Sequence, residues 1–317
     1  MMKKILFSLS SLLIVYVAII FIAPVQLGRF TYNSAVTIES SLYGLDEQFI
    51  DIGEMKMSYY QNDLSHESLQ DRPTILMLHG FSSDKVVWLR FARHFTDKYN
   101  VIIPDMAGHG KTGFKKNWDY KAEAQVNRLV ELLDKLNIKK VHVIGNSMGG
   151  FFSAHFAMSY PTKILSATLV DPAGVVAPEL SDMDKMLVEG KNPFAINNRE
   201  EFDAFYAMTM NSPPWLPDYV FDFVSDKYQK QQSDLMQIFT DFHDQDMLDS
   251  SLDKIKAPVL LMWGDKDRLL DVSSVAVWQA GVGDLKVKIW QGIGHMPMFE
   301  IPTESAEYYQ QFLNQLN

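Results

Sequence analysis

Short runs of apolar, mostly β-branched residues alternate along the chain with longer segments of helical periodicity. Runs that are apolar at every position, not only at alternate ones, are typical of parallel strands covered on both faces. Strand, helix and strand repeated in this way predict an α/β fold with a doubly wound, mostly parallel sheet. The predicted strands are 74–78, 101–103, 141–144, 167–170, 259–262 and 287–289, and the predicted helices are about 86–97, 119–136, 148–160, 271–280 and 303–316.

The repeat is interrupted once, between residues 175 and 250. This segment has no strand pattern and is rich in aromatic residues, Met and Pro. We therefore expect a helical insertion between two strands, which forms a cap. The core domain then consists of residues 48–174 and 251–317.

An uncharged, mostly apolar stretch fills residues 5–23, directly after Lys3 and Lys4. A helix over this stretch would match the hydrocarbon core of a bilayer, which is roughly 30 Å thick. We expect residues 1–30 to form a membrane anchor with a transmembrane helix, and residues 31–47, which are polar and lack periodicity, to form a tether.

A cleaved secretory signal is the alternative interpretation of the N-terminus. Phe21 stands where such a signal carries a small residue before its cleavage site. Both interpretations place the rest of the chain outside the cytoplasm, because the two lysines precede the stretch and only Arg29 follows it closely. Cleavage would make the protein secreted.

Composition and charge narrow the classes of function. The 317 residues are 47% hydrophobic and 21% charged, which is typical of a globular protein and excludes a disordered chain. The chain has no cysteine, so disulfides, a thiolate nucleophile and cysteine-ligated metals are excluded. Its net charge of −10 opposes binding to nucleic acid.

The segment 145–150 reads GNSMGG and lies between a predicted strand and a predicted helix. A serine on such a tight turn is strained, and its hydroxyl projects above the sheet. Gly145 and Gly149 flank it at the two positions where a Cβ would clash. This pattern predicts Ser147 as a nucleophile.

A serine hydroxyl needs a positioned base, and on a fold of this kind the order along the chain is Ser, acid, His. Three histidines follow Ser147. His155 lies on the helix after the turn and His243 lies in the insertion. His295 comes just beyond the last predicted strand and is therefore the predicted base.

The acid should follow the preceding strand, 259–262. Asp267 is favoured because the loop has cleared the sheet edge at this point, whereas Asp265 would close the turn. Asp271 fits the cap of the next helix. Asp171, which ends the strand 167–170, is the alternative acid.

Acyl transfer also needs two backbone N–H groups that stabilise the developing oxyanion. Met148 follows the nucleophile and supplies one of them. The turn after the strand 74–78 supplies the second, which we assign to Phe81. His79 is expected to be a structural hydrogen-bonding residue, and the loop 104–110 is expected to fix backbone shape.

The motifs HGFSS, PDMAGHG, GNSMGG, WGDKD and GHMPMFE occur in the order found in the alpha/beta-hydrolase superfamily, which the chain resembles over residues 48–317. Within the superfamily it is similar to bacterial serine lipases and esterases and to membrane-anchored monoacylglycerol lipases. The resemblance implies a triad of Ser147, Asp267 and His295, an oxyanion hole at Phe81 and Met148, a cap, and no metal or organic cofactor.

The aromatic and methionine side chains of the insertion favour a lipophilic substrate, since each buried methylene contributes about 0.8 kcal/mol. We expect hydrolysis of carboxylic esters with medium or long acyl chains, including monoacylglycerols, beside a membrane. Two alternatives remain. The GNSMGG motif also occurs in hydrolases that cleave carbon–carbon bonds of aromatic ring-fission products, and a hydrolase fold without activity could serve as a membrane-tethered binding module.

Overall fold

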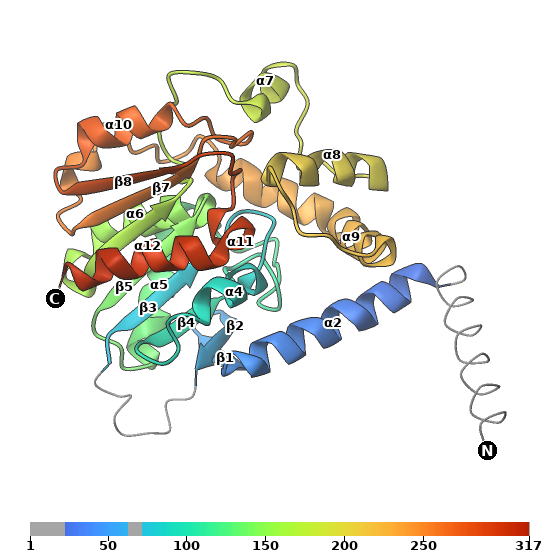
Figure 1. Ribbon diagram of the computed structural model, residues 1–317, viewed down its shortest axis with the longest axis horizontal. Helices are drawn as coiled ribbons and strands as arrows, with labels where there is room; N and C mark the ends of the chain where they lie inside the picture. Colours follow the sequence, from blue (N-terminus) through green and yellow to red (C-terminus); the bar gives the residue numbers. More distant parts are fainter. Residues whose placement is uncertain (1–22, 63–71, 317) are drawn as a thin grey trace.

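A mostly parallel sheet forms the centre of the molecule (Figure 1). The computed structural model describes residues 23–62 and 72–316. In this part of the chain the sheet has eight strands in the order β1-β2-β4-β3-β5-β6-β7-β8, antiparallel from β1 to β4 and parallel from β4 to β8. The strands are β1 Leu45–Ile52, β2 Met55–Asn62, β3 Thr74–Leu78, β4 Asn100–Pro104, β5 Val141–Asn146, β6 Ile164–Val170, β7 Val259–Gly264 and β8 Leu285–Trp290.

All six predicted strands are confirmed as β3 to β8. Successive side chains of a strand point to opposite faces of the sheet, and in β3 both faces are apolar. Ile75 and Met77 join one hydrophobic cluster, while Leu76 and Leu78 join the other. The first cluster includes residues of α4 and α12, and the second includes residues of α5, α6 and α10. This two-sided cover explains why the strand sequences do not alternate. The helices are α4 Leu89–Ala92, α5 Ala122–Lys135, α6 Met148–Ser159, α10 Ser274–Gly281, α11 Pro297–Glu300 and α12 Pro302–Asn314.

One predicted helix is much shorter than expected. A helix was predicted over residues 86–97. The structure has a single 3₁₀ turn there, Lys85–Trp88, followed by the one-turn helix α4 and then by turns. Trp88, Phe91 and Phe95 are nevertheless fully buried. A series of turns can therefore bury side chains at the spacing that otherwise indicates a helix.

The two antiparallel strands β1 and β2 were not predicted. They form a hairpin whose turn contains Gly53 at a φ of 47°. Strand β1 lies at the edge of the sheet, and two of its four exposed residues, Asp46 and Asp51, are charged. Charged edge strands are common because they discourage pairing with another chain, and they hide the apolar pattern of the strand.

The tether predicted over residues 31–47 is wrong. These residues belong to helix α2, Pro24–Leu42, and to the start of β1. The helix packs along α9, Asp218–Phe242, which is the longest helix between β6 and β7 (Figure 1). Tyr32 of α2 contacts the ring of Phe223 of α9, with ring centroids 5.6 Å apart.

The buried side of α2 explains why its sequence did not indicate a helix. The buried residues of α2 are Gly28 and Ser40, whereas the large apolar side chains of Phe30, Ile38 and Leu42 are exposed. An ideal Cβ on Gly28 would lie 2.0 Å from the carbonyl oxygen of Tyr219, so the two backbones approach closely only because Gly28 has no side chain. The apolar stripe that marks a packed helix is therefore missing.

Among the described residues, no helix has both the length and the apolar character that a membrane crossing requires. The span predicted over residues 5–23 lies outside the described residues, apart from Ala23.

The segment between β6 and β7 is helical, as predicted. It contains α7 Asp182–Val188, α8 Arg199–Thr209 and α9, with no strand in residues 175–250, all of which the structure describes. Figure 1 shows these helices beyond the edge at which the parallel strands end. We call this segment the cap.

The Gly28 contact predicts the effect of one added methyl group. Gly28→Ala should loosen α2 from α9, although the same change on a free helix face would stabilise the helix by about 1 kcal/mol. Overpacking costs typically about 1–3 kcal/mol, so the clash should dominate. We expect faster trypsin cleavage after Arg29 in the full-length chain.

Asn33→Ala is the matched control, because Asn33 is an exposed residue of the same helix. It should leave the cleavage rate unchanged or lower it. Slower cleavage in Gly28→Ala than in the unmodified protein would show that α2 does not depend on this close approach.

Candidate active site

Ser147 occupies the sharp turn between β5 and α6. Its φ and ψ are 56° and −119°, which places a non-glycine residue in a strained region of backbone conformation. An ideal Cβ on Gly145 would lie 2.1 Å from the carbonyl oxygen of Gly149, and a Cβ on Gly149 would lie 2.3 Å from that of Leu78. Both glycines are therefore required for the strand, the helix and β3 to approach this closely.

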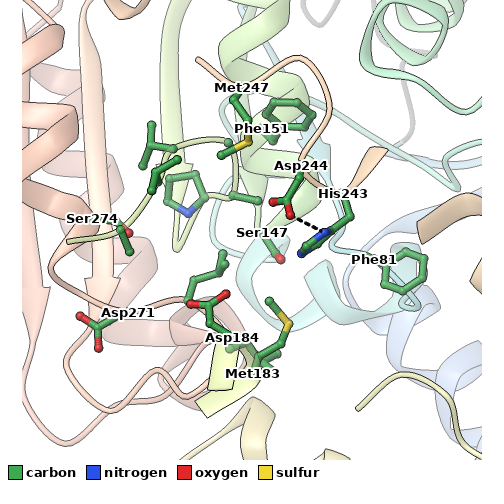
Figure 2. A pocket seen from close by; sticks show the side chains of 18 of the residues that line it. Phe81, Ser147, Phe151, Met183, Asp184, His243, Asp244, Met247, Asp271 and Ser274 are labelled. Carbon is green, nitrogen blue, oxygen red and sulfur yellow. Dashed lines mark ion pairs between the residues drawn. The ribbon is translucent and has the colours of Figure 1, made fainter. Parts of the chain in front are cut away.

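Ser147 lines a cavity of about 170 Å³ between the sheet edge and the cap. Figure 2 shows its hydroxyl group together with Phe81, Phe151 and His243 around this space. The apolar lining comes from both the core and the cap. It includes Phe81, Phe151, Pro172, Val175, Leu180, Met183, Phe194, Phe239, Phe242, Met247 and Leu269.

The charged residues of the cavity lining are acidic. Asp184, Asp244 and Asp271 line it, and no Lys or Arg is among the described residues that do so. His243 also lines it, with its Nδ1 atom 3.2 Å from a carboxylate oxygen of Asp244 (Figure 2). His243 was expected to play no part because it lies in the insertion, and only the folded cap shows that it faces the cavity.

His295 and Asp267 form a buried pair in the loops that follow β8 and β7. The Nδ1 atom of His295 lies 2.7 Å from Oδ2 of Asp267. The other carboxylate oxygen, Oδ1, accepts hydrogen bonds from the backbone amides of Leu269 and Leu270 at 2.8 and 3.0 Å. Three N–H donors therefore surround Asp267, which stabilises its charged form and fixes the side of the imidazole that faces it.

Asn146 joins the His295 loop to the serine turn. Its side-chain amide donates hydrogen bonds to the carbonyl oxygens of His295 and Val170, at 2.9 and 3.2 Å. The structure thus places the backbone of residue 295 against the residue that precedes Ser147. No role was predicted for Asn146, although an amide side chain next to the predicted nucleophile was a visible signal.

Asp171, the alternative acid, follows β6 and lies close to the same pair. One carboxyl oxygen of Asp171, one of Asp267 and a ring nitrogen of His295 all lie within 4.8 Å of one another. Nδ1 of His295 donates its hydrogen bond to Asp267, not to Asp171. Burial, together with the charge of Asp267, raises the pKa of Asp171 well above its usual value.

The two predicted oxyanion donors belong to segments that pass close to Ser147. Met148 is the first residue of α6, so its amide has no acceptor within the helix. Phe81 lines the same cavity as Ser147. An ideal Cβ on the preceding residue, Gly80, would lie 3.2 Å from Cβ of Ser147, so this turn passes close to the serine.

His79 has the structural role that was expected. Its Nδ1 atom lies 2.8 Å from the carbonyl oxygen of Gly80, and its Nε2 atom accepts a hydrogen bond from the amide of Met106 at 3.0 Å. Burial lowers its pKa, so the ring is held in the neutral form. It therefore connects the loop after β3 with the loop after β4.

The loop after β4 is held by Asp105, in agreement with the expectation that it fixes backbone shape. The carboxylate of Asp105 accepts hydrogen bonds from the backbone amides of Lys85 and Lys111 at 2.9 and 2.8 Å. It also pairs with the buried ammonium group of Lys85 at 2.5 Å. The burial of Lys85 was not predicted.

Comparison with known proteins agrees with this architecture. Residues 73–302 match the model of the alpha/beta hydrolase fold family. Lipase 1 of Psychrobacter immobilis is 33% identical over 243 residues, which cover 75% of this chain and 76% of the relative. Monoacylglycerol lipase ABHD6 of Mus musculus is 28% identical over 254 residues, which cover 76% of each chain.

A solved structure resembles the chain over almost its whole length. It is the crystal structure of a membrane phospholipase A, described as a novel bacterial virulence factor, with a TM-score of 0.87 and 33% sequence identity over 99% of both chains. The family match covers well over half of the chain and agrees with the observed sheet order and serine turn. The chain therefore belongs to the alpha/beta hydrolase family, among its lipases and esterases.

Proposed function

We propose that the protein hydrolyses carboxylic esters with lipophilic acyl chains through an acyl-enzyme on Ser147. The observation that carries this proposal is the buried hydrogen bond between His295 and Asp267, tied through Asn146 to the serine turn. A nucleophile, a base and an acid that orients the base are the three parts that acyl transfer by serine requires.

In the proposed mechanism, His295 removes the proton of Ser147 as the serine oxygen attacks the ester carbonyl. The backbone amides of Phe81 and Met148 stabilise the oxyanion, and loss of one such donor typically costs about 3–4 kcal/mol. His295 then protonates the departing alcohol and afterwards activates the water that releases the acid. Asp267 holds the imidazole and stabilises its charged form.

The cavity supports a substrate with an apolar acyl chain. Most of its lining consists of aromatic and aliphatic side chains from the core and the cap. Each methylene group that moves from water into such surroundings contributes about 0.8 kcal/mol. The names of the relatives, a lipase and a monoacylglycerol lipase, are consistent with lipid esters as substrates.

We also propose that the protein is anchored in a membrane by residues 5–23, with the catalytic domain outside the cytoplasm. The apolar stretch ends directly before α2, so an anchor would continue into a helix that packs on the cap. The similarity to a membrane phospholipase A supports this location. A membrane would present lipid esters to the cavity at high local concentration.

Replacing the proposed nucleophile should abolish turnover while the fold is retained. Ser147→Ala should lower kcat for p-nitrophenyl esters by about 10⁶-fold, and Asp267→Asn should lower it by about 10⁴-fold. A fluorophosphonate probe should label the unmodified protein at Ser147 and should not label Ser147→Ala, with circular dichroism as the control for folding.

Ester turnover retained by Ser147→Ala would refute the serine mechanism. Binding of lipid without labelling by the probe would instead support the non-catalytic module. Preferential turnover of a ring-fission dienoate over p-nitrophenyl esters would support carbon–carbon bond hydrolysis.

The acidic lining of the cavity predicts selection by the charge of the leaving group. With the same acyl chain, a neutral monoacylglycerol should have a higher kcat/KM than an anionic lysophosphatidic acid, by about tenfold at low salt. The difference should narrow as salt screens the carboxylates. It should also narrow in the double variant Asp244→Asn/Asp271→Asn.

The double variant Asp253→Asn/Asp284→Asn removes two exposed carboxylates outside the cavity lining and is the matched control for net charge. It should leave the ratio of the two kcat/KM values unchanged. Equal values for both substrates at low salt in the unmodified protein would exclude this charge selection.

Membrane anchoring predicts how the full-length chain fractionates. It should sediment with membranes, resist extraction with alkaline carbonate and dissolve in detergent, because a spanning helix is held by its apolar surface. Protease added to spheroplasts should degrade the catalytic domain. Release by carbonate, or full protection from the protease, would contradict the anchor or its orientation.

A further inference from the structure

Asp171 is a buried acid that the proposed mechanism does not use. Its side chain is 0% exposed, and its backbone amide donates a hydrogen bond to the carbonyl oxygen of Met262 at 2.9 Å. One carboxyl oxygen, Oδ1, accepts a hydrogen bond from the amide of Gly264 at 2.8 Å. The other, Oδ2, has no hydrogen-bond partner among the described residues. A buried polar atom left in this way calls for an explanation.

The backbone at Asp171 is strained as well. Its φ of 43° lies in the left-handed region, which non-glycine residues rarely adopt, although Asp and Asn tolerate it better than most. Such conformations persist where the surrounding structure imposes them, and they gather at functional sites. In this conformation the carboxyl group lies beside Asp267 and His295, within the 4.8 Å cluster described above.

Two buried carboxyl groups at this spacing cannot both be charged without a large cost in free energy. The number of hydrogen-bond donors decides which of them carries the proton. Asp267 receives three N–H groups, from Leu269, Leu270 and His295. Asp171 receives one, from Gly264. Asp267 is therefore the carboxylate, and Asp171 is the neutral acid.

We propose that Asp171 is a positioning residue, a neutral carboxylic acid whose O–H group donates a hydrogen bond to the carboxylate of Asp267 and holds it in line with His295. This inference rests on the proposed serine mechanism. A carboxylate offers about four acceptor positions, so Asp267 has room for a fourth donor. The raised pKa of Asp171 agrees with this protonation state.

The carboxylate of Glu300 also acts on this cluster. Glu300 of α11 accepts a hydrogen bond from the amide of Gly294 at 2.9 Å, and its negative charge also raises the pKa of Asp171. Because Glu300 is unchanged in the variants below, its effect on His295 is the same in all of them.

Asp171→Asn is the decisive variant, because Asn keeps the shape, tolerates the left-handed backbone and offers an N–H donor in place of the O–H. The measurement is the pH dependence of kcat/KM, whose acidic limb reports the pKa of His295 in the free enzyme. If Asp171 is neutral, this limb should not move. If Asp171 is charged, its removal should shift the acidic limb to lower pH by about one pH unit or more, because an opposite charge within about 4–6 Å stabilises imidazolium.

Asp171→Ala removes the donor altogether. It should lower kcat by about 10- to 100-fold with little change in KM, since a small misplacement of a catalytic group costs on this order. Asp171→Asn should restore most of this loss. Asp253→Asn, on the surface, is the control and should match the unmodified protein.

Each outcome decides the proposal. A shift of the acidic limb to lower pH in Asp171→Asn would overturn it, and so would an unchanged kcat in Asp171→Ala. Loss of activity on treatment with EDTA would also overturn it, because a cation would then occupy the cluster in place of a proton. If Asp171→Ala fails to fold, the pH profile of Asp171→Asn still decides. Fluorophosphonate labelling of Ser147 in the unmodified protein separates failure of this inference from failure of the serine mechanism.

Discussion

Parallel strands end at the same edge of a sheet, and this constraint assembles the candidate site. Strands β3, β5, β6, β7 and β8 are parallel neighbours, so the residues that follow them meet although they are far apart in the sequence. Phe81, Ser147, Asp171, Asp267 and His295 each follow one of these strands within a few residues. The chemistry therefore depends on the order of the strands more than on any single loop.

The close packing at this edge leaves room for few side chains. Gly145 and Gly149 let β5, α6 and β3 approach, and Gly264 has a comparable role at the end of β7. An ideal Cβ on Gly264 would lie 2.1 Å from the carbonyl oxygen of Gly294. Water is largely excluded from the space behind the serine, where His295 and Asp267 are only 4% and 9% exposed. Electrostatic interactions are stronger in such surroundings, so every buried charge needs a partner.

The sequence predicted most of the core and the sharp turn that carries Ser147, for identifiable reasons. The central strands are covered on both faces, so they appear as continuous apolar runs. The GNSMGG turn has a steric signature. Helix α2 could not be predicted in the same way, because the residues it buries are Gly28 and Ser40 and not large apolar side chains. Other features of the candidate site depend on contacts between distant segments, which a single sequence does not show. They are the hydrogen bonds of Asn146, the position of His243 at the cavity and the proximity of Asp171 to Asp267.

The long helix α9 takes part in two different contacts. Near its beginning, Tyr219 and Phe223 lie against α2, and near its end, Phe239 and Phe242 line the cavity. A straight helix transmits a tilt from one end to the other, because its backbone hydrogen bonds resist bending. Any swing of the cap that widens the entrance to the serine must therefore either carry the amino-terminal helix with it or separate the two backbones at Gly28. Helix α9 therefore links the amino-terminal helix to the wall of the cavity that Ser147 lines.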